Sequence, residues 1–252
     1  MSVATQSERG APRIRSEWWR PALVSLLGLL LVLATAEIVL DGAAGRSPLI
    51  PKSPPIAGWL GGIGERLGYR IFLIAILAFA ASYGAMLLLA RRPAISKRWA
   101  IVLIGVLHAI VFAGPILIST DVFSYIAYAR MGVEHGLNPY LHGPVAISRD
   151  PIFQYVGHDW RHVETAYGPL YSLLSYPFAP LGVRGSLWGM KILAQVASIG
   201  TLALTWRCAR ARQLDPVWAI LAVGANPLYV IYGLGGAHND LLMLLLMVTA
   251  VS

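Results

Sequence analysis

Uninterrupted apolar runs about as long as a membrane is thick dominate this sequence, and they constrain its fold more than any other feature. Such runs occupy residues 21–40, 71–90 and 99–118. A helix needs about 20 mostly apolar residues to cross the roughly 30 Å hydrocarbon core of a bilayer. Because lipid offers no hydrogen bonds to an open backbone, segments of this kind fold as helices there. The runs predict an all-α, polytopic integral membrane protein.

Weaker membrane-span candidates follow in the second half of the chain. Residues 186–206 and 216–233 are apolar over a comparable length, and another apolar run begins at residue 241 but ends at residue 252. A helix over that last run reaches only about 18 Å, which is less than the core thickness. The sequence therefore predicts five to six transmembrane helices, and the short last run suggests a truncated member of a longer class of protein.

Composition and charge agree with a membrane location. Charged residues make up 13% of the chain and hydrophobic residues 57%, whereas soluble proteins carry about 25% charged residues. The net charge of +8 would suit a nucleic-acid partner, but the basic residues are spread over loops between spans. We therefore expect the lipid bilayer, and no nucleic acid, as a partner.

Three basic clusters, at residues 9–20, 91–98 and 207–212, set the expected orientation. Short cytoplasmic loops are rich in Lys and Arg, so all three clusters are placed inside the cell membrane, with a cytoplasmic N-terminus. In order, the expected segments are a cytoplasmic tail (1–20), three transmembrane helices (21–118) enclosing a Pro/Gly-rich outer loop (41–69), an extracytoplasmic loop (119–185) and further transmembrane helices (186–252).

The first apolar run has an alternative interpretation. The sequence "ATA" at residues 34–36 resembles a signal-peptidase site after a short apolar core. The run continues through residues 38–40, however, which favours an uncleaved anchor. Cleavage would leave the remaining topology unchanged.

Two segments of the extracytoplasmic loop have predicted structure. Residues 121–135 form an amphipathic helix on the membrane surface, since an apolar stripe at Val122 and Ile126 opposes polar residues such as Ser124 and Tyr128. Ser119 or Thr120 is the expected N-cap, Gly136 the stop, and Asn138-Pro139 a turn. Residues 167–182 are apolar but broken by three prolines, so we expect an interfacial or re-entrant segment.

This topology brings polar residues from distant parts of the chain to one face. Asp121 follows the third span, and "GGAHND" (235–240) follows the fifth, so both emerge outside. Asp121 is either a charge that stabilises the start of its helix or a carboxylate at the lipid boundary that can act as a general base. The residues alone leave both interpretations of Asp121 open.

Three motifs in the second half resemble those of a known family. "DVFSYIAYARMGVEHGLNPY" (121–140) holds an Asp, a Tyr four residues later and a Gly-x-Asn-Pro-Tyr turn. "AYGPLYSLLSYP" (166–177) and "GGAHNDLLMLLLMV" (235–248) follow in the expected order. All three are similar to motifs of GT-C fold glycosyltransferases, in particular of actinobacterial alpha-mannosyltransferases that use a polyprenol-phosphate-mannose donor. The resemblance covers about residues 100–250, and family members continue through further spans.

The resemblance implies an inverting transferase that needs no cofactor and moves a sugar, mannose, from a polyprenyl phosphate to a glycan or lipid-glycan acceptor at the outer face. By this resemblance, Asp121 takes the acceptor proton as general base. Lys191 lies within a span, where an ionisable residue is a functional candidate, and it is the expected phosphate partner. The other residues expected to bind substrate are Tyr125, Arg130, Asn138, Tyr140, Tyr167, His238, Asn239 and Asp240.

Each of these candidates has a structural alternative. Lys191 could snorkel to the interface, Arg130 could be a solvated loop charge, and Asn239 or Asp240 could cap the last helix. Tyrosines gather at membrane interfaces in any case. His158 and His162 have the i, i+4 spacing of zinc ligands, but "HDWRH" lacks the acid placement of a protease motif, so we expect no metal site.

Two other functions remain possible at this level. A transporter would show internal repeats and polar breaks at mid-membrane. Asn226-Pro227 is one such break, but no convincing repeat is visible and the polar residues gather at one face. A non-catalytic fragment that assembles with a partner would agree with the short last span.

Overall fold

The structure is a computed structural model that describes residues 19–43, 69–90 and 95–252. Most of the predicted tail and of the Pro/Gly-rich loop lies outside these residues. The described residues are helical and contain no strand. The α-helices are α1 (Trp19–Ala43), α2 (Tyr69–Ala90), α3 (Lys97–Ala113), α4 (Asp121–Val133), α5 (Pro169–Ser175), α6 (Gly182–Ala211), α7 (Pro216–Gly224) and α8 (Asp240–Val251). Shorter turns are η1 (Pro144–Ile147), η2 (Phe153–Tyr155), η3 (His158–Trp160), η4 (Tyr176–Leu181) and the π-helix η5 (Leu228–Leu234).

Three helical stretches are long and apolar enough to cross a membrane. They are α1, α2 and the stretch Pro169–Ala211, which runs from α5 through η4 into α6. α7 and η5 together form a fourth, bent by 47°. α3, with 17 residues, and α8, with 12, are shorter. The all-α membrane class is thus confirmed, while the count of five to six spans and the re-entrant placement of residues 167–182 stay predictions.

The bend between α7 and η5 follows from Asn226 and Pro227. The Asn226 Oδ1 accepts a hydrogen bond from the Leu228 N–H at 2.9 Å, and a proline disfavours helical backbone in the residue before it. The wider π-helical turn that follows is a rare element that often occurs at functional sites. The polar break predicted in this segment is present, and it directs η5 toward the end of α3.

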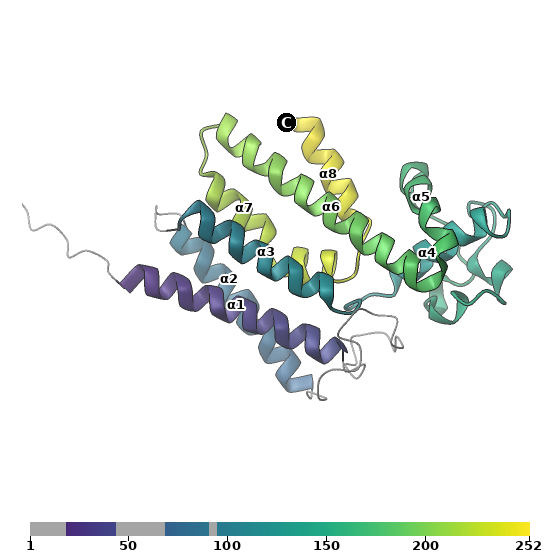
Figure 1. The fold of residues 1–252 in the computed structure, drawn as a ribbon, viewed down its shortest axis with the longest axis horizontal. Helices are drawn as coiled ribbons and strands as arrows, with labels where there is room; N and C mark the ends of the chain where they lie inside the picture. Colours follow the sequence, from purple (N-terminus) through teal and green to yellow (C-terminus); the bar gives the residue numbers. More distant parts are fainter. Residues whose placement is uncertain (1–18, 44–68, 91–94) are drawn as a thin grey trace, which may run out of the picture.

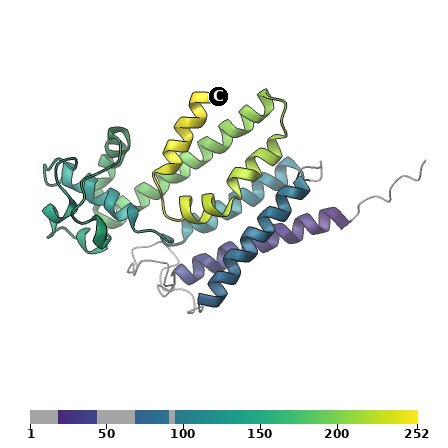
Figure 2. The ribbon, with the colours of Figure 1, turned by 180° about the vertical axis from the view of Figure 1, so that it is seen from behind.

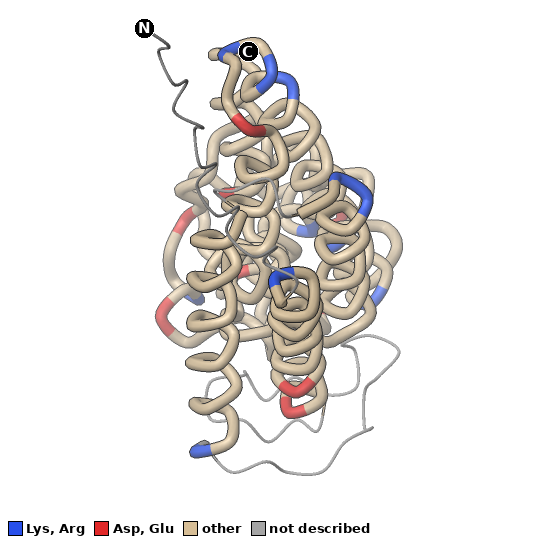
Figure 3. Tube along the Cα trace, turned by 90° about the vertical axis from the view of Figure 1, so that its left-hand side faces the viewer, with Lys and Arg blue, Asp and Glu red and all other residues tan. Residues whose placement is uncertain are grey.

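Six of the twelve basic residues of the described segments lie at one end of the helix bundle, which we call the basic end: Arg20, Lys97, Arg98, Arg207, Arg210 and Arg212. The starts of α1 and α3 and the end of α6 lie there, opposite the lobe that contains α4 and α5 (Figures 1 and 2). The Lys97 ammonium lies 4.8 Å from the centre of the Trp206 ring, which joins α3 to α6 at this end. Figure 3 looks onto it and shows several Lys and Arg segments. The membrane orientation expected from the basic clusters stays a prediction.

The surroundings of α4 differ from the prediction. Its end is as expected, because Gly136 has a φ of +62° and the Leu137 N–H bonds to the Met131 carbonyl, a glycine-dependent helix stop. The exposed polar face is wrong, since Ser124 and Tyr128 are only 1% and 3% exposed. Residues 134–181 fold around α4 and cover both of its faces, which a periodic pattern within α4 cannot indicate. α4 is therefore a buried core helix of the lobe.

Candidate active site

Two carboxylates from distant parts of the chain meet at one histidine. The Nδ1 of His238 lies 3.7 Å from Asp121 Oδ2 and 3.7 Å from Asp240 Oδ2. Asp121 starts α4, whereas His238 is in the turn before α8. The side chains of Asp121 and Asp240 are 24% and 55% exposed, and that of His238 is 2% exposed. The predicted convergence of the two polar segments is therefore present, with solvent access on the carboxylate side.

The connector between α3 and α4, residues 114–120, holds the two halves of the site together. The Leu117 N–H donates to the Gly235 carbonyl at 2.8 Å, which joins the connector to the turn after η5. The Lys191 ammonium of α6 donates to the Gly114 carbonyl. The Asp121 N–H donates to Ser119 Oγ at 3.1 Å, so Ser119 rather than Thr120 supplies the side-chain oxygen at the start of α4. Backbone contacts thus set the spacing between Asp121 and Asp240.

His238 is packed between a ring and the two carboxylates. Its imidazole stacks on Tyr232 with the ring centres 4.1 Å apart and an angle of 21° between planes. Burial lowers the pKa of His238, although the charges of Asp121 and Asp240 act in the opposite direction. The Nε2 atom is buried and has no hydrogen-bond partner within the protein. The ring is therefore fixed in orientation and retains one free nitrogen.

Tyrosines line the side of the site that α4 and α5 contribute. Tyr125 packs edge-on against Tyr167 and Tyr171, with ring centres 4.7 and 5.1 Å away. Its hydroxyl donates to Asn239 Oδ1 at 3.2 Å, which links α4 to the start of α8. Burial and the neighbouring tyrosines raise the pKa of the Tyr125 phenol, so it stays a hydrogen-bond donor. We call Tyr125, Tyr167, Tyr171 and Tyr232 the tyrosine wall.

Two members of the tyrosine wall were not among the residues predicted from the sequence. Tyr171 lies in α5, two residues into the helix that begins at Pro169, whereas Tyr167 precedes the helix, so no periodic signal in the sequence joins the two rings. Tyr232 lies within a segment that reads as a membrane span, and its position depends on the π-helical register of η5. The apolar pattern of that segment contains no indication of this register.

Asn138 and Tyr140 form a turn that contacts Tyr167. The Asn138 Oδ1 accepts from the Tyr140 N–H at 2.9 Å, which forms the predicted turn. The Tyr140 hydroxyl donates to the Tyr167 carbonyl at 2.9 Å and also contacts Ser172 Oγ. Both residues therefore position Tyr167, and their predicted contact with substrate stays a prediction.

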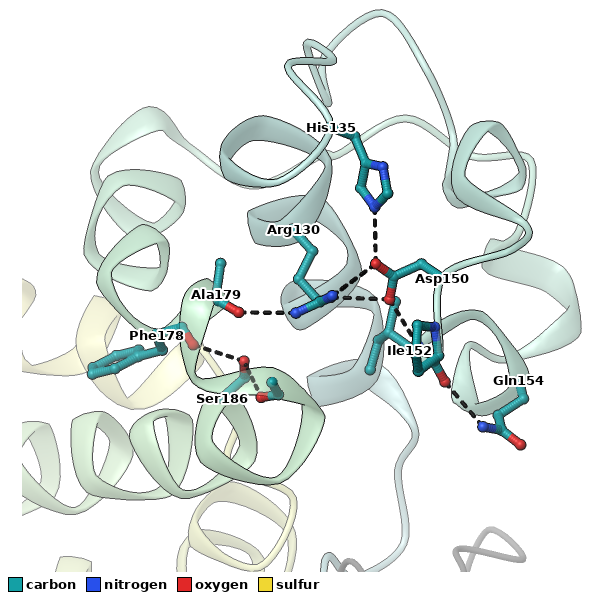
Figure 4. A network of polar contacts seen from close by, with 10 residues as sticks. Arg130, His135, Asp150, Ile152, Gln154, Phe178, Ala179 and Ser186 are labelled. Atoms are coloured by element: carbon teal, nitrogen blue, oxygen red, sulfur yellow. Dashed lines mark hydrogen bonds and ion pairs between the residues drawn. The ribbon is translucent and has the colours of Figure 1, made fainter.

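Arg130 lies near the far end of α4, about 13 Å along the helix from Asp121. Its guanidinium binds both carboxylate oxygens of Asp150 at 2.9–3.0 Å and the Ala179 carbonyl at 2.9 Å. His135 Nε2 lies 2.8 Å from the same carboxylate (Figure 4). These contacts engage the guanidinium inside the lobe, so we do not include Arg130 in the candidate site.

The ammonium of Lys191 is enclosed next to the connector. Lys191 is 4% exposed, and its Nζ lies 4.7 Å and 5.6 Å from the ring centres of Trp188 and Phe112. An ammonium has three donors, and the Gly114 carbonyl takes one of them. The alternative of snorkelling to solvent is not what the structure shows, and the predicted role in phosphate binding stays a prediction.

No group of three or more metal-ligating side chains is present among the described residues. His158 and Asp159 contact each other at 3.5 Å, but both side chains are at least 90% exposed.

Comparison with known proteins gives one family. A sequence model described as "Alpha-(1->6)-mannopyranosyltransferase, N-terminal domain" matches residues 23–252. The chain is 31% identical over 137 residues to alpha-(1->6)-mannopyranosyltransferase A of Corynebacterium glutamicum, covering 53% of this chain and 27% of that one. It is 25% identical over 234 residues to alpha-(1->6)-mannopyranosyltransferase A of Mycobacterium tuberculosis, covering 87% of this chain and 44% of that one.

The chain spans less than half the length of each of these relatives. No solved structure matches it. The family model covers almost the whole chain, including α4, the tyrosine wall and the start of α8. The chain therefore belongs to the alpha-(1->6)-mannopyranosyltransferase family, and it matches the N-terminal domain of that family.

Proposed function

We propose that this chain carries the catalytic carboxylate of an integral-membrane, GT-C type mannosyltransferase. The enzyme moves mannose from a polyprenyl-phosphate donor to a hydroxyl of a glycan or lipid-glycan acceptor, with inversion. The observation that carries the proposal is the meeting of Asp121 with His238 and Asp240 beside the tyrosine wall. The names of the relatives support mannose as the sugar.

Asp121 is the proposed general base. As the acceptor hydroxyl attacks the anomeric carbon, its proton passes to a carboxylate oxygen while the bond to the donor phosphate breaks. The carboxylate must be reachable, and its side chain is partly exposed. His238 holds Asp121 and Asp240 at a common distance and lies between their negative charges. The alternative, in which Asp121 only stabilises the start of α4, gives no reason for a second carboxylate beside it.

The tyrosine wall and Lys191 are the proposed contacts to the donor. Aromatic faces and hydrogen-bonding hydroxyls suit a sugar ring, which has both apolar and polar surfaces. Lys191, enclosed beneath the connector, is the proposed source of positive charge for the phosphate of the leaving group. A transporter has less support. After the bend at Asn226-Pro227, η5 leads toward the carboxylates and does not line a separate passage.

The site end of the bundle is proposed to face the outside of the cell membrane, in a multi-pass arrangement with a cytoplasmic N-terminus. The described Lys and Arg residues at the starts of α1 and α3 and at the end of α6 lie at the opposite end, and Lys and Arg favour the cytoplasmic side. Glycan acceptors and lipid-linked donors would meet at this outer boundary.

A donor-competition assay tests the proposed function. Membranes carrying the chain are given radiolabelled decaprenyl-phosphate-mannose or GDP-mannose together with an alpha-(1->6)-mannan oligosaccharide. Membranes with the Corynebacterium glutamicum relative serve as the positive control. We expect label to pass to the oligosaccharide from the lipid-linked donor only. Transfer from GDP-mannose in washed membranes, or no transfer from either donor while the relative is active, would overturn the proposal.

Replacing His238 tests whether this residue positions the two carboxylates for catalysis or only supports the fold. His238→Gln keeps a polar side chain but loses the stacked imidazole, so Asp121 and Asp240 are no longer held apart. We expect kcat to fall about tenfold or more with a changed pH–rate profile, because general catalysis contributes about 10²–10⁴-fold and depends on geometry. Thermal unfolding checks folding. An unaltered kcat and pH profile in a folded variant would show that His238 has no part in transfer.

A further inference from the structure

An apolar groove lies between α3 and α6. It has a volume of about 660 Å³, and Ile220 of α7 also lines it. It runs from Lys97 at the basic end to Phe112, about 22 Å along α3. The groove belongs neither to the candidate site nor to its connector, and nothing in the proposed chemistry uses it.

The polar residues within the groove are satisfied by the protein itself. His108 Nε2 lies 3.2 Å from the Gly224 carbonyl, which can only accept, so this nitrogen carries the proton. His108 Nδ1 lies 3.3 Å from the Gln195 amide nitrogen and accepts from it. The ring nitrogens of His108 are therefore both engaged by the protein, and apart from the Gln195 amide the middle of the groove is apolar, which makes a hydrocarbon chain a suitable ligand.

The dimensions of the groove suit one extended hydrocarbon chain. A volume of about 660 Å³ over about 22 Å corresponds to a mean cross-section of about 30 Å². An extended hydrocarbon chain lying along α3 fits this narrow, elongated shape.

The two ends of the groove differ in charge and access. At the basic end, Lys97 lines the groove, is exposed, and lies over the Trp206 ring, an aromatic–cation pair of the kind found at membrane interfaces. At the other end, the Phe112 ring packs against Trp188 at 5.4 Å, and Lys191 is bonded to the connector. Lys97 is the one Lys or Arg among the residues that line the groove, and its exposed ammonium is accessible to an anionic head group at the basic end.

We propose that this groove binds one hydrocarbon chain of an anionic phospholipid whose phosphate pairs with Lys97. The lipid comes from the leaflet at the basic end, where anionic lipids are attracted by clustered Lys and Arg. Arg98 and Arg210, both exposed, lie at the same end and add to the positive charge. Such a lipid stabilises the packing of α3 against α6 by binding only the folded chain.

Native mass spectrometry of the purified chain tests this proposal with dioleoyl phosphatidylglycerol as the probe. Dioleoyl phosphatidylcholine and decaprenyl phosphate are the comparison lipids. Lys97→Gln removes the proposed phosphate contact. Gly105→Leu adds a side chain to the groove lining, at a position where a Cβ meets no atom within 4 Å. Gly84→Leu, on α2 and equally unobstructed, is the matched control outside the groove.

We expect the wild type and Gly84→Leu to bind phosphatidylglycerol at least tenfold more tightly than phosphatidylcholine. Lys97→Gln should weaken phosphatidylglycerol binding about fivefold, and Gly105→Leu should abolish it, both with the unfolding temperature of the lipid-free protein retained. Equal binding of the two phospholipids, unchanged binding in Gly105→Leu, or preference for decaprenyl phosphate would overturn the proposal. Because no sugar transfer is measured, failure here leaves the proposed transferase chemistry intact.

Discussion

Replacing Asp121 by asparagine is expected to reduce mannosyl transfer by about 10²–10⁴-fold, the contribution of a general base. Asparagine has nearly the same shape and can still accept hydrogen bonds, but it cannot take up the proton of the acceptor hydroxyl. The loss should appear in kcat, whereas KM for the lipid-linked donor should change little, because the tyrosine wall is untouched. Initial rates with labelled decaprenyl-phosphate-mannose measure both quantities.

Stability should separate this effect from a folding defect. Asp121 starts α4, where a negative charge contributes about 0.3–1 kcal/mol, so Asp121→Asn should lower the unfolding temperature only slightly. Asp159→Asn is the matched control, since Asp159 lies in the same lobe and its side chain is 98% exposed. A folded Asp121→Asn protein that transfers mannose at the wild-type rate would exclude Asp121 as the base.

The second large effect is expected for Asp150→Ala, which removes the partner of Arg130. The carboxylate is 2% exposed and the guanidinium 13%, so the substitution leaves a charge poorly hydrated inside the lobe. Breaking a buried pair in this way costs about 3–5 kcal/mol, which corresponds to a fall in unfolding temperature of about 10 °C. Differential scanning fluorimetry in detergent measures it. Asp159→Ala, which removes an exposed carboxylate of the same lobe, should cause no measurable change.

The same pair predicts how stability depends on pH. Burial alone would raise the pKa of Asp150, but hydrogen bonds from Arg130, the Ile152 N–H and His135 lower it to about 2. The lowered pKa means that about 2 kcal/mol of stability is present above pH 4 and is lost as the pH falls toward 2. Asp150→Ala should flatten this dependence. If the wild type and Asp150→Ala showed the same dependence of stability on pH, both below and above pH 4, the role of the pair would be contradicted.

The membrane class and the approach of the two polar segments could be predicted because they depend on local signals. The apolar length of α1 and α2, the stop at Gly136 and the break at Asn226-Pro227 are all visible in short windows of sequence. The meeting of Asp121 with Asp240 follows from counting spans, and the positions of basic residues determine that count. These features required no knowledge of how side chains pack.

The remaining features depend on contacts between distant residues. Arg130 was predicted to meet substrate because its partner, Asp150, lies 20 residues away and nothing in either segment indicates the pairing. The polar face of α4 was predicted to be exposed because the fold of residues 134–181 around it leaves no periodic signal. Tyr232 enters the site only through the π-helical register of η5. In each case the decisive information is tertiary.

The connector is bonded to Gly235 and Lys191, and these bonds limit how its length can vary in proteins of this kind. One residue of extended chain is about 3.3 Å long, so an insertion between Gly114 and Ser119 would carry one carboxylate away from the other without unfolding any helix. The turn at residues 212–215, between α6 and α7, lies at the other end of the bundle and bears no such constraint. We therefore expect insertions and deletions to disturb the site more in the connector than in that turn, so the connector's length should mark a working site better than any single side chain in it.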